Sequence, residues 1–332
     1  MRVTVIGAGV TGLVAALELA ARGARVEIIE RGAQLGAQAC GWFAGGMLAP
    51  WCEQESAEPQ VSQFGQMALD WWPRHFSETV CNGTLVVAPA RDHAELDHFG
   101  RRTEHFERIG AERIAELEPD LSGRFRQALF FAGEAHLDPR RAVAAMAARL
   151  GEMGVPIHFG VDATTFPIDA DQVLDCRGFA ARDTLDDLRG VRGVRGEMLL
   201  VRTRDVTLSR PVRLLHPRMP LYVIPRADGL FMIGATMIES AHGGPITARS
   251  AVELLNGAYV LHPAFGEAAI VDMGVGIRPA FADNLPRLVR RGYTLHVNGL
   301  YRHGFLLAPA MAHQAAQAIF STLSGESSCR SS

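Results

Sequence analysis

The chain of 332 residues contains no lysine, and arginine alone supplies its 33 basic side chains. Pyridoxal-phosphate enzymes and class I aldolases form a Schiff base on a lysine amine, so both classes are excluded. The phosphate-binding P-loop also needs a lysine and is excluded for the same reason. No block of like charge stands out around the net charge of −3, so we do not expect nucleic acid as the main partner.

The sequence is also poor in cysteine, and its five cysteines form no CxxC pair. An odd number without such pairs is typical of a reducing compartment and predicts neither a disulfide framework nor a zinc site. No apolar run reaches the roughly 18 residues of a membrane span, and the glycines near the N-terminus are unlike a signal peptide. We therefore expect a cytoplasmic protein without a metal. The cysteines are Cys40, Cys52, Cys81, Cys176 and Cys329.

A βαβ unit is predicted at the start of the chain. Residues 2–6 and 25–30 are short runs rich in valine and isoleucine, which indicates buried strands. Residues 13–22 between them are typical of a helix made of small side chains. A GxGxxG pattern joins the first strand to this helix, with its glycines at Gly7, Gly9 and Gly12.

The strand and helix around this pattern favour a dinucleotide-binding turn. The glycines allow a tight turn and a close approach of a pyrophosphate to the N-terminus of the helix. Glu30 ends the second strand 18 residues after Gly12, where a carboxylate can accept the two ribose hydroxyls of an adenosine. The pattern does not separate NAD from FAD, and Arg31 is either a ribose-phosphate ligand or a solvated side chain.

The remaining pattern is α/β at both ends with a β-rich middle, where strands alternate with turn residues. Asp138 is a good N-cap for a helix that starts at Pro139. Further helices are predicted at residues 64–76, 247–261 and 308–323, and strands at 84–88, 156–159, 172–176, 197–202, 221–225, 230–235 and 295–297. We expect a discontinuous nucleotide domain (residues 1–80, 138–195 and 270–332) with a second domain inserted (residues 81–137 and 196–269).

Two further segments are rich in glycine. Residues 44–50 read AGGMLAP, where small side chains would let the backbone lie against a flat ring, although a flexible loop is the plain alternative. Residues 298–309 read NGLYRHGFLLAP and run into the last predicted helix. The dipole of that helix would place partial positive charge on whatever the loop holds.

Seven segments together resemble the D-amino-acid oxidase family of FAD oxidoreductases, and within it the members that oxidise glycine. They span nearly the whole chain in the expected order, although residues 52–134 match more loosely. The GxGxxG pattern is common to many families, whereas GIRP followed by LYRHGFLLAP is far more specific. The segments are VIGAGVTG, EIIERG, FAGGMLAP, RGEMLLVR, LYVIPRADGLFMIGATM, GIRP and NGLYRHGFLLAP.

The resemblance implies a Rossmann-type FAD-binding domain with an inserted α+β substrate domain built on an antiparallel sheet. It also implies noncovalent FAD held by residues that match the family by position. One departure is Gly41–Trp42, where the family often has small hydroxyl residues that bond the pyrophosphate. The implied cofactor residues are Gly7, Gly9, Val10, Thr11, Gly12, Glu30, Arg31, Cys40, Gly41, Gly45, Gly46, Met47, Ala163, Gly178, Leu300, Tyr301, Arg302, His303, Gly304, Phe305 and Leu306.

At the substrate, the resemblance implies that Arg278 of GIRP binds a carboxylate and that Tyr222 lies beside it. An arginine fork supplies two parallel charge-assisted bonds to a carboxylate, and a tyrosine hydroxyl can add a third donor. Arg302 is implied as a second arginine, and Met47 and Met237 as pocket walls. The plain alternatives are a surface arginine at 278, a packed strand residue at 222 and core methionines. For His303, likewise, we expect a backbone contact rather than acid–base work.

The implied reaction moves a hydride from Cα of glycine or another small amino acid to the flavin, so no side-chain nucleophile is needed. The imine hydrolyses to glyoxylate (for glycine) and ammonia, and oxygen becomes hydrogen peroxide, in the service of thiamine thiazole biosynthesis. The implied partners are the amino acid and oxygen, with a homo-oligomer possible. Three alternatives stay open: a D-amino-acid dehydrogenase with another electron acceptor, a sarcosine oxidase, and a non-catalytic dinucleotide sensor.

Overall fold

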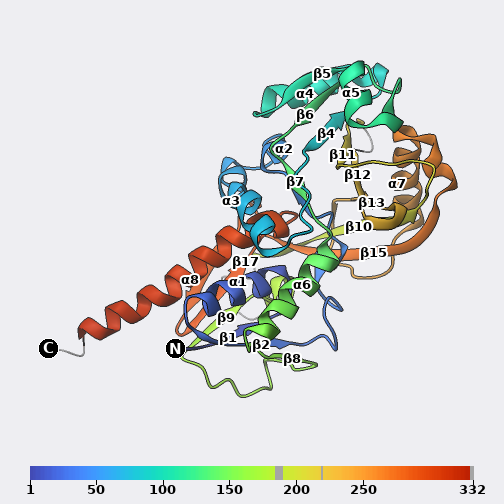
Figure 1. Cartoon of the computed structure of the whole chain (residues 1–332). Coiled ribbons are helices and arrows are strands. Elements are labelled where there is room, and N and C mark those ends of the chain that lie inside the picture. The colour runs from blue at the N-terminus through green and yellow to red at the C-terminus, as the bar shows by residue number, and fades with distance from the viewer. Residues whose placement is uncertain (184–189, 218–219, 330–332) are drawn as a thin grey trace.

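A computed structural model describes residues 1–183, 190–217 and 220–329 of the chain, and Figure 1 shows its two main bodies. The lower body in that view is built on a six-stranded sheet with the order β16-β17-β9-β1-β2-β8, in which only β16 runs antiparallel to its neighbour. Its strands are β1 (Arg2–Ile6), β2 (Arg25–Glu30), β8 (Ile157–Phe159), β9 (Gln172–Asp175), β16 (Arg287–Arg291) and β17 (Thr294–Asn298).

Helices pack against this sheet and against one another. Helix α1 contacts both α6 and α8, and α8 also contacts α3. As the sequence predicts, Asp138 caps α6, because its Oδ1 accepts from the backbone nitrogen of Arg140 at 2.9 Å. The indole of the fully buried Trp72 donates to the Phe305 carbonyl at 2.8 Å and so joins α3 to α8. The helices are α1 (Val10–Ala21), α3 (Pro59–His75), α6 (Pro139–Glu152) and α8 (Gly304–Cys329).

The second body is a nine-stranded sheet with the order β14-β10-β13-β12-β11-β4-β6-β5 and with β15 paired to β10. All its neighbours are antiparallel except β4 and β11. Its strands are β4 (Thr84–Val87), β5 (Glu107–Gly110), β6 (Gln127–Phe131), β10 (Arg192–Arg202), β11 (Val212–Leu214), β12 (Leu221–Pro225), β13 (Leu230–Gly234), β14 (Ile238–Glu239) and β15 (Ala269–Ala280).

Shorter elements complete this body and the junction between the sheets. Helix α7 contacts β10, β12 and β13, and the apolar residues between them form a core separate from that of the six-stranded sheet. The remaining α-helices are α2 (Pro50–Glu53), α4 (His93–Arg102), α5 (Ala111–Leu117) and α7 (Ala248–Leu261), and β3 (Met47–Leu48) pairs with β7 (Ala135–His136). The 3-10 turns include η1 (Cys40–Phe43), η2 (Ala90–Asp92), η3 (Pro119–Leu121), η4 (Gly178–Ala181), η6 (Ala227–Gly229) and η7 (Pro263–Glu267).

The predicted fold class is confirmed: a Rossmann-type parallel sheet accompanies a separate, mainly antiparallel one. The helix expected at residues 64–76 begins earlier, at Pro59, and the strand expected at 197–202 begins at Arg192. Strand β15 was not predicted, and it pairs with β10 in the larger sheet although the predicted boundary at residue 270 assigns most of it to the nucleotide domain. The exact domain boundaries stay a prediction. Among the described residues, no helix is long and apolar enough to cross a membrane.

Candidate active site

One large cavity lies where the two sheets meet. Its volume is about 670 Å³, and its walls come from the carboxyl ends of β1, β2 and β9 together with residues of β10, β12 and β15. The carboxyl ends of parallel strands are where α/β sheets bind their ligands. Four cysteine side chains are described, and all four are free. Within the described ranges, no group of three or more metal-ligating side chains is brought together.

The predicted dinucleotide turn forms the start of this cavity. Gly7 has a φ of +101°, a conformation that side chains rarely adopt. A Cβ on Gly12 would lie 1.9 Å from the Gly7 carbonyl oxygen, so only glycine permits this contact between helix and turn. Helix α1 begins after Gly9, which has no side chain to cap it. A Cβ added to Gly9 would have no neighbour closer than 4.0 Å, so the space beside this residue is open. The first amides of α1 therefore remain available to an anion in the cavity.

Glu30 is held in a fixed orientation at the end of β2. Its Oε2 accepts from the backbone nitrogen of Ala8 at 2.8 Å, and its Oε1 accepts from that of Gly32 at 2.6 Å. It lines the cavity together with Ala163, as expected for an adenosine end. Arg31 also lines the cavity and donates from Nε to the Gln38 side chain at 2.9 Å.

Sequence reasoning missed the fixed arginine at the end of β9. Arg177 lines the cavity and forms a two-point contact with Asp175, with Nε at 3.0 Å from Oδ1 and Nη2 at 2.6 Å from Oδ2. Burial raises the pKa of Asp175, but hydrogen bonds from His296 and Arg177 outweigh it and lower the pKa to about 2. The ionised carboxylate of Asp175 therefore fixes the guanidinium of Arg177 at the cavity. The signal for this residue in the sequence was its position just after a predicted strand.

Gly45, in the glycine-rich segment at residues 44–46, packs against Tyr222 on β12. A Cβ on Gly45 would lie 3.1 Å from the Tyr222 ring and 2.7 Å from Ile224, so a larger residue would displace the ring. A similar close approach occurs between Gly276 of β15 and Cys40, where a Cβ would lie 3.1 Å from the cysteine backbone. Burial raises the pKa of the Cys40 thiol, which favours its neutral form.

Arg278 faces the cavity from β15, across from β10. Its Nη1 donates to the backbone carbonyl of Thr236 at 2.9 Å, and no described carboxylate forms an ion pair with it. A Cβ on Gly196 would lie 2.2 Å from its Nη2, so a larger residue on β10 would displace the guanidinium from this position. The structure therefore places on the cavity wall a half-buried positive charge that has no counter-ion in the part of the chain that the structure describes.

Arg302 has a different environment, although it also lines the cavity. Its Nη2 donates to Glu53 at 2.6 Å and to Ser56 at 2.8 Å. Glu53 is only 7% exposed and also pairs with Arg213. Burial raises the pKa of Glu53, but Arg302, Arg213 and His303 lower it far more, so it stays ionised. Sequence reasoning missed both Glu53 and Arg213, and neither lies in a recognisable motif.

A second cavity, of about 210 Å³, shares Tyr301 and Arg302 with the first. Met237 lines this smaller cavity, and its Sδ accepts from Arg302 Nη1 at 3.3 Å. His303 also lines it, and its Nε2 lies 2.8 Å from Glu53, so its imidazole contacts a carboxylate; the backbone contact that we expected for this residue stays a prediction. Burial lowers the pKa of His303 despite that carboxylate, which favours a neutral ring.

Most of the predicted site residues line the large cavity. They are Gly7, Gly9, Val10, Thr11, Glu30, Arg31, Cys40, Gly41, Gly45, Ala163, Gly178, Tyr222, Arg278, Leu300, Tyr301, Arg302, Gly304 and Phe305. Six others do not: Gly12, Gly46, Met47, Met237, His303 and Leu306. Leu306 is buried against Gly65 of α3, and Met47 packs in a small apolar cluster with Tyr222. The roles of all these residues stay predictions.

Comparison with known proteins gives consistent matches along the chain. The profile of the family described as FAD dependent oxidoreductase (DAO) matches residues 2–318. A Rhizobium etli protein, whose name assigns it to thiamine biosynthesis as the oxidoreductase ThiO, is 58% identical over 321 residues, which is 96% of either chain. A glycine oxidase of Pseudomonas aeruginosa is 29% identical over 93% of this chain and 92% of its own.

Solved structures share the fold. The crystal structure of glycine oxidase from Geobacillus kaustophilus has a TM-score of 0.81 at 23% identity, covering 96% of this chain and 95% of that one. Glycine oxidase from Bacillus cereus has a TM-score of 0.83 at 22% identity, over 97% of this chain and 95% of its own.

Proposed function

The chain belongs to the FAD dependent oxidoreductase family, and from that premise we propose that it oxidises glycine or another small amino acid. The observation that carries this proposal is the guanidinium of Arg278, which faces the cavity, donates to the neutral carbonyl of Thr236 and has no counter-ion among the described residues. A buried or half-buried charge is costly unless it is paired, so the site favours a ligand that brings a carboxylate. The names of two similar proteins, one assigned to thiamine biosynthesis and one called glycine oxidase, support the same interpretation.

The residues present fit a noncovalent FAD in the large cavity. The uncapped start of α1 after Gly9 suits a pyrophosphate, and the oriented carboxylate of Glu30 suits a ribose. Cys40, Gly45, Leu300 and Tyr301 line the same cavity and would lie along the ring system. FAD held there would supply the acceptor for a hydride from Cα of the amino acid, and in an oxidase the electrons would pass on to oxygen.

The side chains of this protein bind and orient the substrate in this proposal. Two N–H groups of Arg278 would hold the carboxylate in a planar fork, and the Tyr222 hydroxyl would add a donor. Fixing the carboxylate fixes Cα relative to the ring system, which is the main contribution of the protein to the rate. The substrate leaves as an imine, and water converts it to the keto acid and ammonia. No side chain of the described residues is assigned as a general base.

The cellular role that we propose follows the name of the 58%-identical relative. The imine or its glyoxylate would serve the formation of the thiazole of thiamine. A cytoplasmic location is proposed because the described cysteines are free thiols, as in a reducing compartment. A homo-oligomer remains a further possibility to be tested by its mass in solution.

The direct test is anaerobic reduction of the flavin by glycine, sarcosine and D-alanine, followed by absorbance. We expect at least one of the three amino acids to bleach the flavin absorbance. They differ by methyl groups, and a pocket discriminates between such substrates by only about 1–3 kcal/mol per methyl group. In air, one hydrogen peroxide per amino acid supports an oxidase, whereas little peroxide supports a dehydrogenase with another acceptor. A protein that binds FAD and is reduced by none of the three would contradict the proposal and favour a non-catalytic sensor.

A further inference from the structure

Strand β10 presents different chemistry on its two faces where it passes the cavity. Successive side chains of a strand point to opposite faces, so Arg195 and Glu197 share one face and Gly196 lies on the other. Gly196 lines the cavity under the guanidinium of Arg278. On the opposite face Arg195 and Glu197 are 3% and 0% exposed, although both carry ionisable side chains. Such burial requires partners, and the partners reveal what the pair does.

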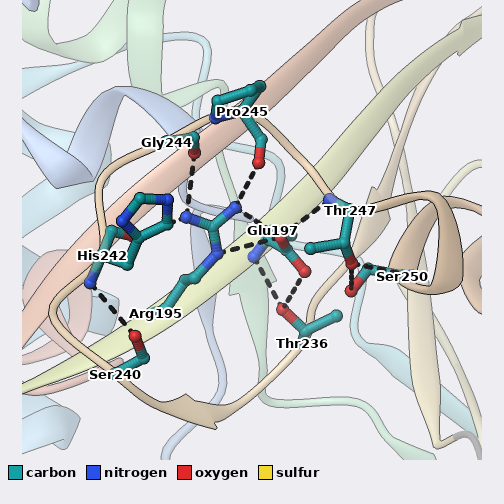
Figure 2. Close-up of polar contacts among 9 residues, drawn as sticks. All are labelled: Arg195, Glu197, Thr236, Ser240, His242, Gly244, Pro245, Thr247 and Ser250. Atoms are coloured by element: carbon teal, nitrogen blue, oxygen red, sulfur yellow. Dashed lines mark hydrogen bonds and ion pairs between the residues drawn. The ribbon is translucent and has the colours of Figure 1, made fainter.

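Arg195 closes the loop that leads from β14 to α7. Its Nη1 donates to the carbonyls of His242 at 2.5 Å and Gly244 at 2.9 Å, and its Nη2 donates to that of Pro245 at 2.6 Å. The same guanidinium donates to Oε1 of Glu197, at 2.9 Å from Nε and 2.6 Å from Nη2. Figure 2 shows the loop folded around this guanidinium, which is fixed from several directions.

Glu197 connects this closed loop to the segment that precedes it. Its backbone nitrogen donates to the hydroxyl of Thr236 at 2.9 Å, and the Thr236 hydroxyl lies 3.3 Å from its Oε2. The backbone nitrogen of Thr236 donates in turn to the carbonyl of Glu197 at 3.2 Å. The backbone nitrogen of Thr247, the N-cap of α7, also donates to Oε1 of Glu197 at 3.2 Å. Glu197 therefore holds Thr236 at three points.

The segment held in this way contacts both arginines of the candidate site. The Thr236 carbonyl accepts from Arg278 at 2.9 Å, and the neighbouring Met237 sulfur accepts from Arg302 at 3.3 Å. A carbonyl accepts in a defined direction, so its orientation sets where the guanidinium fork points. Because Arg195 balances Glu197, the network adds no net charge that would compete for a carboxylate near Arg278.

We propose that Glu197 is a positioning residue of this enzyme: together with Arg195 it fixes Thr236, whose carbonyl orients the carboxylate-binding fork of Arg278. The inference rests on the proposed function, in which Arg278 receives the amino-acid carboxylate. It adds a substrate-binding role for three residues that lie outside the large cavity, Arg195, Glu197 and Thr236. A purely structural anchor for the loop is the competing role, and it affects stability without affecting the fork.

The test uses the FAD-loaded protein and substitutes Thr236, because substituting Glu197 would leave Arg195 buried without its partner. Thr236→Val removes the hydroxyl that bonds Glu197 while keeping the shape of the side chain. We expect the Kd for acetate to rise on the order of 10-fold, as when a hydrogen bond to a charged group is lost, and the KM for glycine to rise by a similar factor. Acetate binding is followed through the flavin spectrum. The limiting rate of anaerobic reduction by glycine should change less, and Thr236→Ser should restore binding.

Thr247→Ala is the matched control. It removes the N-cap hydroxyl of α7 but keeps the backbone nitrogen that bonds Glu197 and leaves Thr236 intact. We expect a lower melting temperature with wild-type affinity for acetate. If this variant loses as much affinity as Thr236→Val, or if Thr236→Val binds acetate as the wild type does, the positioning role is overturned.

Arg278→Ala separates a failure of this inference from a failure of the proposed function. If Arg278→Ala weakens acetate and glycine binding but Thr236→Val does not, only the positioning role is wrong. If Arg278→Ala leaves both affinities unchanged, the carboxylate site itself is misassigned and the proposed function loses its support.

Discussion

Two regions at the same end of the cavity each contain an arginine, and they differ in how that charge is balanced. The Glu53 region consists of Glu53, Arg213, Arg302 and His303, where one buried carboxylate meets two guanidinium groups. The Arg278 region consists of Arg278, Gly196 and Thr236, where the guanidinium meets a neutral carbonyl. Arg302 therefore has a carboxylate partner within the protein, which it shares with Arg213, whereas Arg278 has none among the described residues and remains available to a ligand.

This difference distinguishes two arginines that the family resemblance places together at the substrate. An ion pair that is buried and hydrogen-bonded holds elements together, and breaking it is costly. A guanidinium aimed into a cavity without a counter-ion costs stability but gains binding energy from a carboxylate. The Glu53 region should therefore control stability, and the Arg278 region should control substrate binding.

The largest effect is expected from Glu53→Gln. It removes the negative charge between Arg213 and Arg302, and leaving buried charges unpaired costs about 3–5 kcal/mol. We expect this loss in the free energy of unfolding of the FAD-loaded protein, measured with urea. Glu118→Gln is a matched control because it makes the same change in another buried ion pair. Glu118 is 1% exposed and pairs with Arg210 at 2.8 Å, and it lines neither cavity. An unchanged stability of Glu53→Gln would remove the proposed contrast between the regions.

Arg278→Ala should produce the opposite pattern. The KM for glycine should rise by the equivalent of about 2–5 kcal/mol, since a desolvated charge pair is lost, while the stability to urea stays near wild type. Arg278→Lys keeps the charge but not the planar fork, so it should recover little of the affinity. Steady-state kinetics of peroxide release measures all three proteins. Full recovery in the lysine variant would show that charge alone, without the fork geometry, binds the substrate.

A smaller effect concerns pH and a carboxyl next to the Glu53 region. Glu134 is 1% exposed and accepts from the backbone nitrogen of Cys52 at 2.7 Å. Burial raises the pKa of Glu134 from 4.5 to about 7. The folded protein therefore binds this proton more tightly than the unfolded chain. The contribution to stability is full below about pH 4.5 and is lost as the pH rises to about 7, by up to about 3 kcal/mol.

Glu134→Gln should remove this dependence. Urea unfolding of both proteins at pH 5 and pH 8 gives the comparison, because the other titrating carboxyls are common to both and cancel in the difference. We expect the wild type to lose more stability than Glu134→Gln between these two values. Equal losses in the two proteins would show that this carboxyl titrates near its ordinary value.

The parts of the molecule that the sequence predicts well depend on local chemistry. The turn at Gly7, the strand ending at Glu30 and the cap at Asp138 each follow from residues a few positions apart. Arg278 could be singled out because it lies in a specific four-residue motif. For the turn and the cap, the neighbours in sequence are also the neighbours that determine the conformation.

The parts that could not be predicted depend on contacts between distant residues. Glu53 meets Arg302 across 249 positions of the chain, and nothing near Glu53 in sequence indicates this pairing. Strand β15 has half-exposed residues at its start and no clear alternation, so its pairing with β10 was missed. Gly45 was interpreted as a surface for a flat ring, whereas its packing against Tyr222 gives a second reason for its size.

The ladder between β10 and β15 limits how the molecule can deform. It runs from Arg192 opposite Ala280 to Arg202 opposite Ala269, and just beyond Arg278 the carbonyl of Pro279 accepts from the backbone nitrogen of Tyr301 at 2.9 Å. The ladder stiffens the larger sheet, to which both strands belong, and the bond between Pro279 and Tyr301 ties that sheet to the loop that leads into α8. A motion that separated the two sheets at this wall of the cavity would have to break that bond.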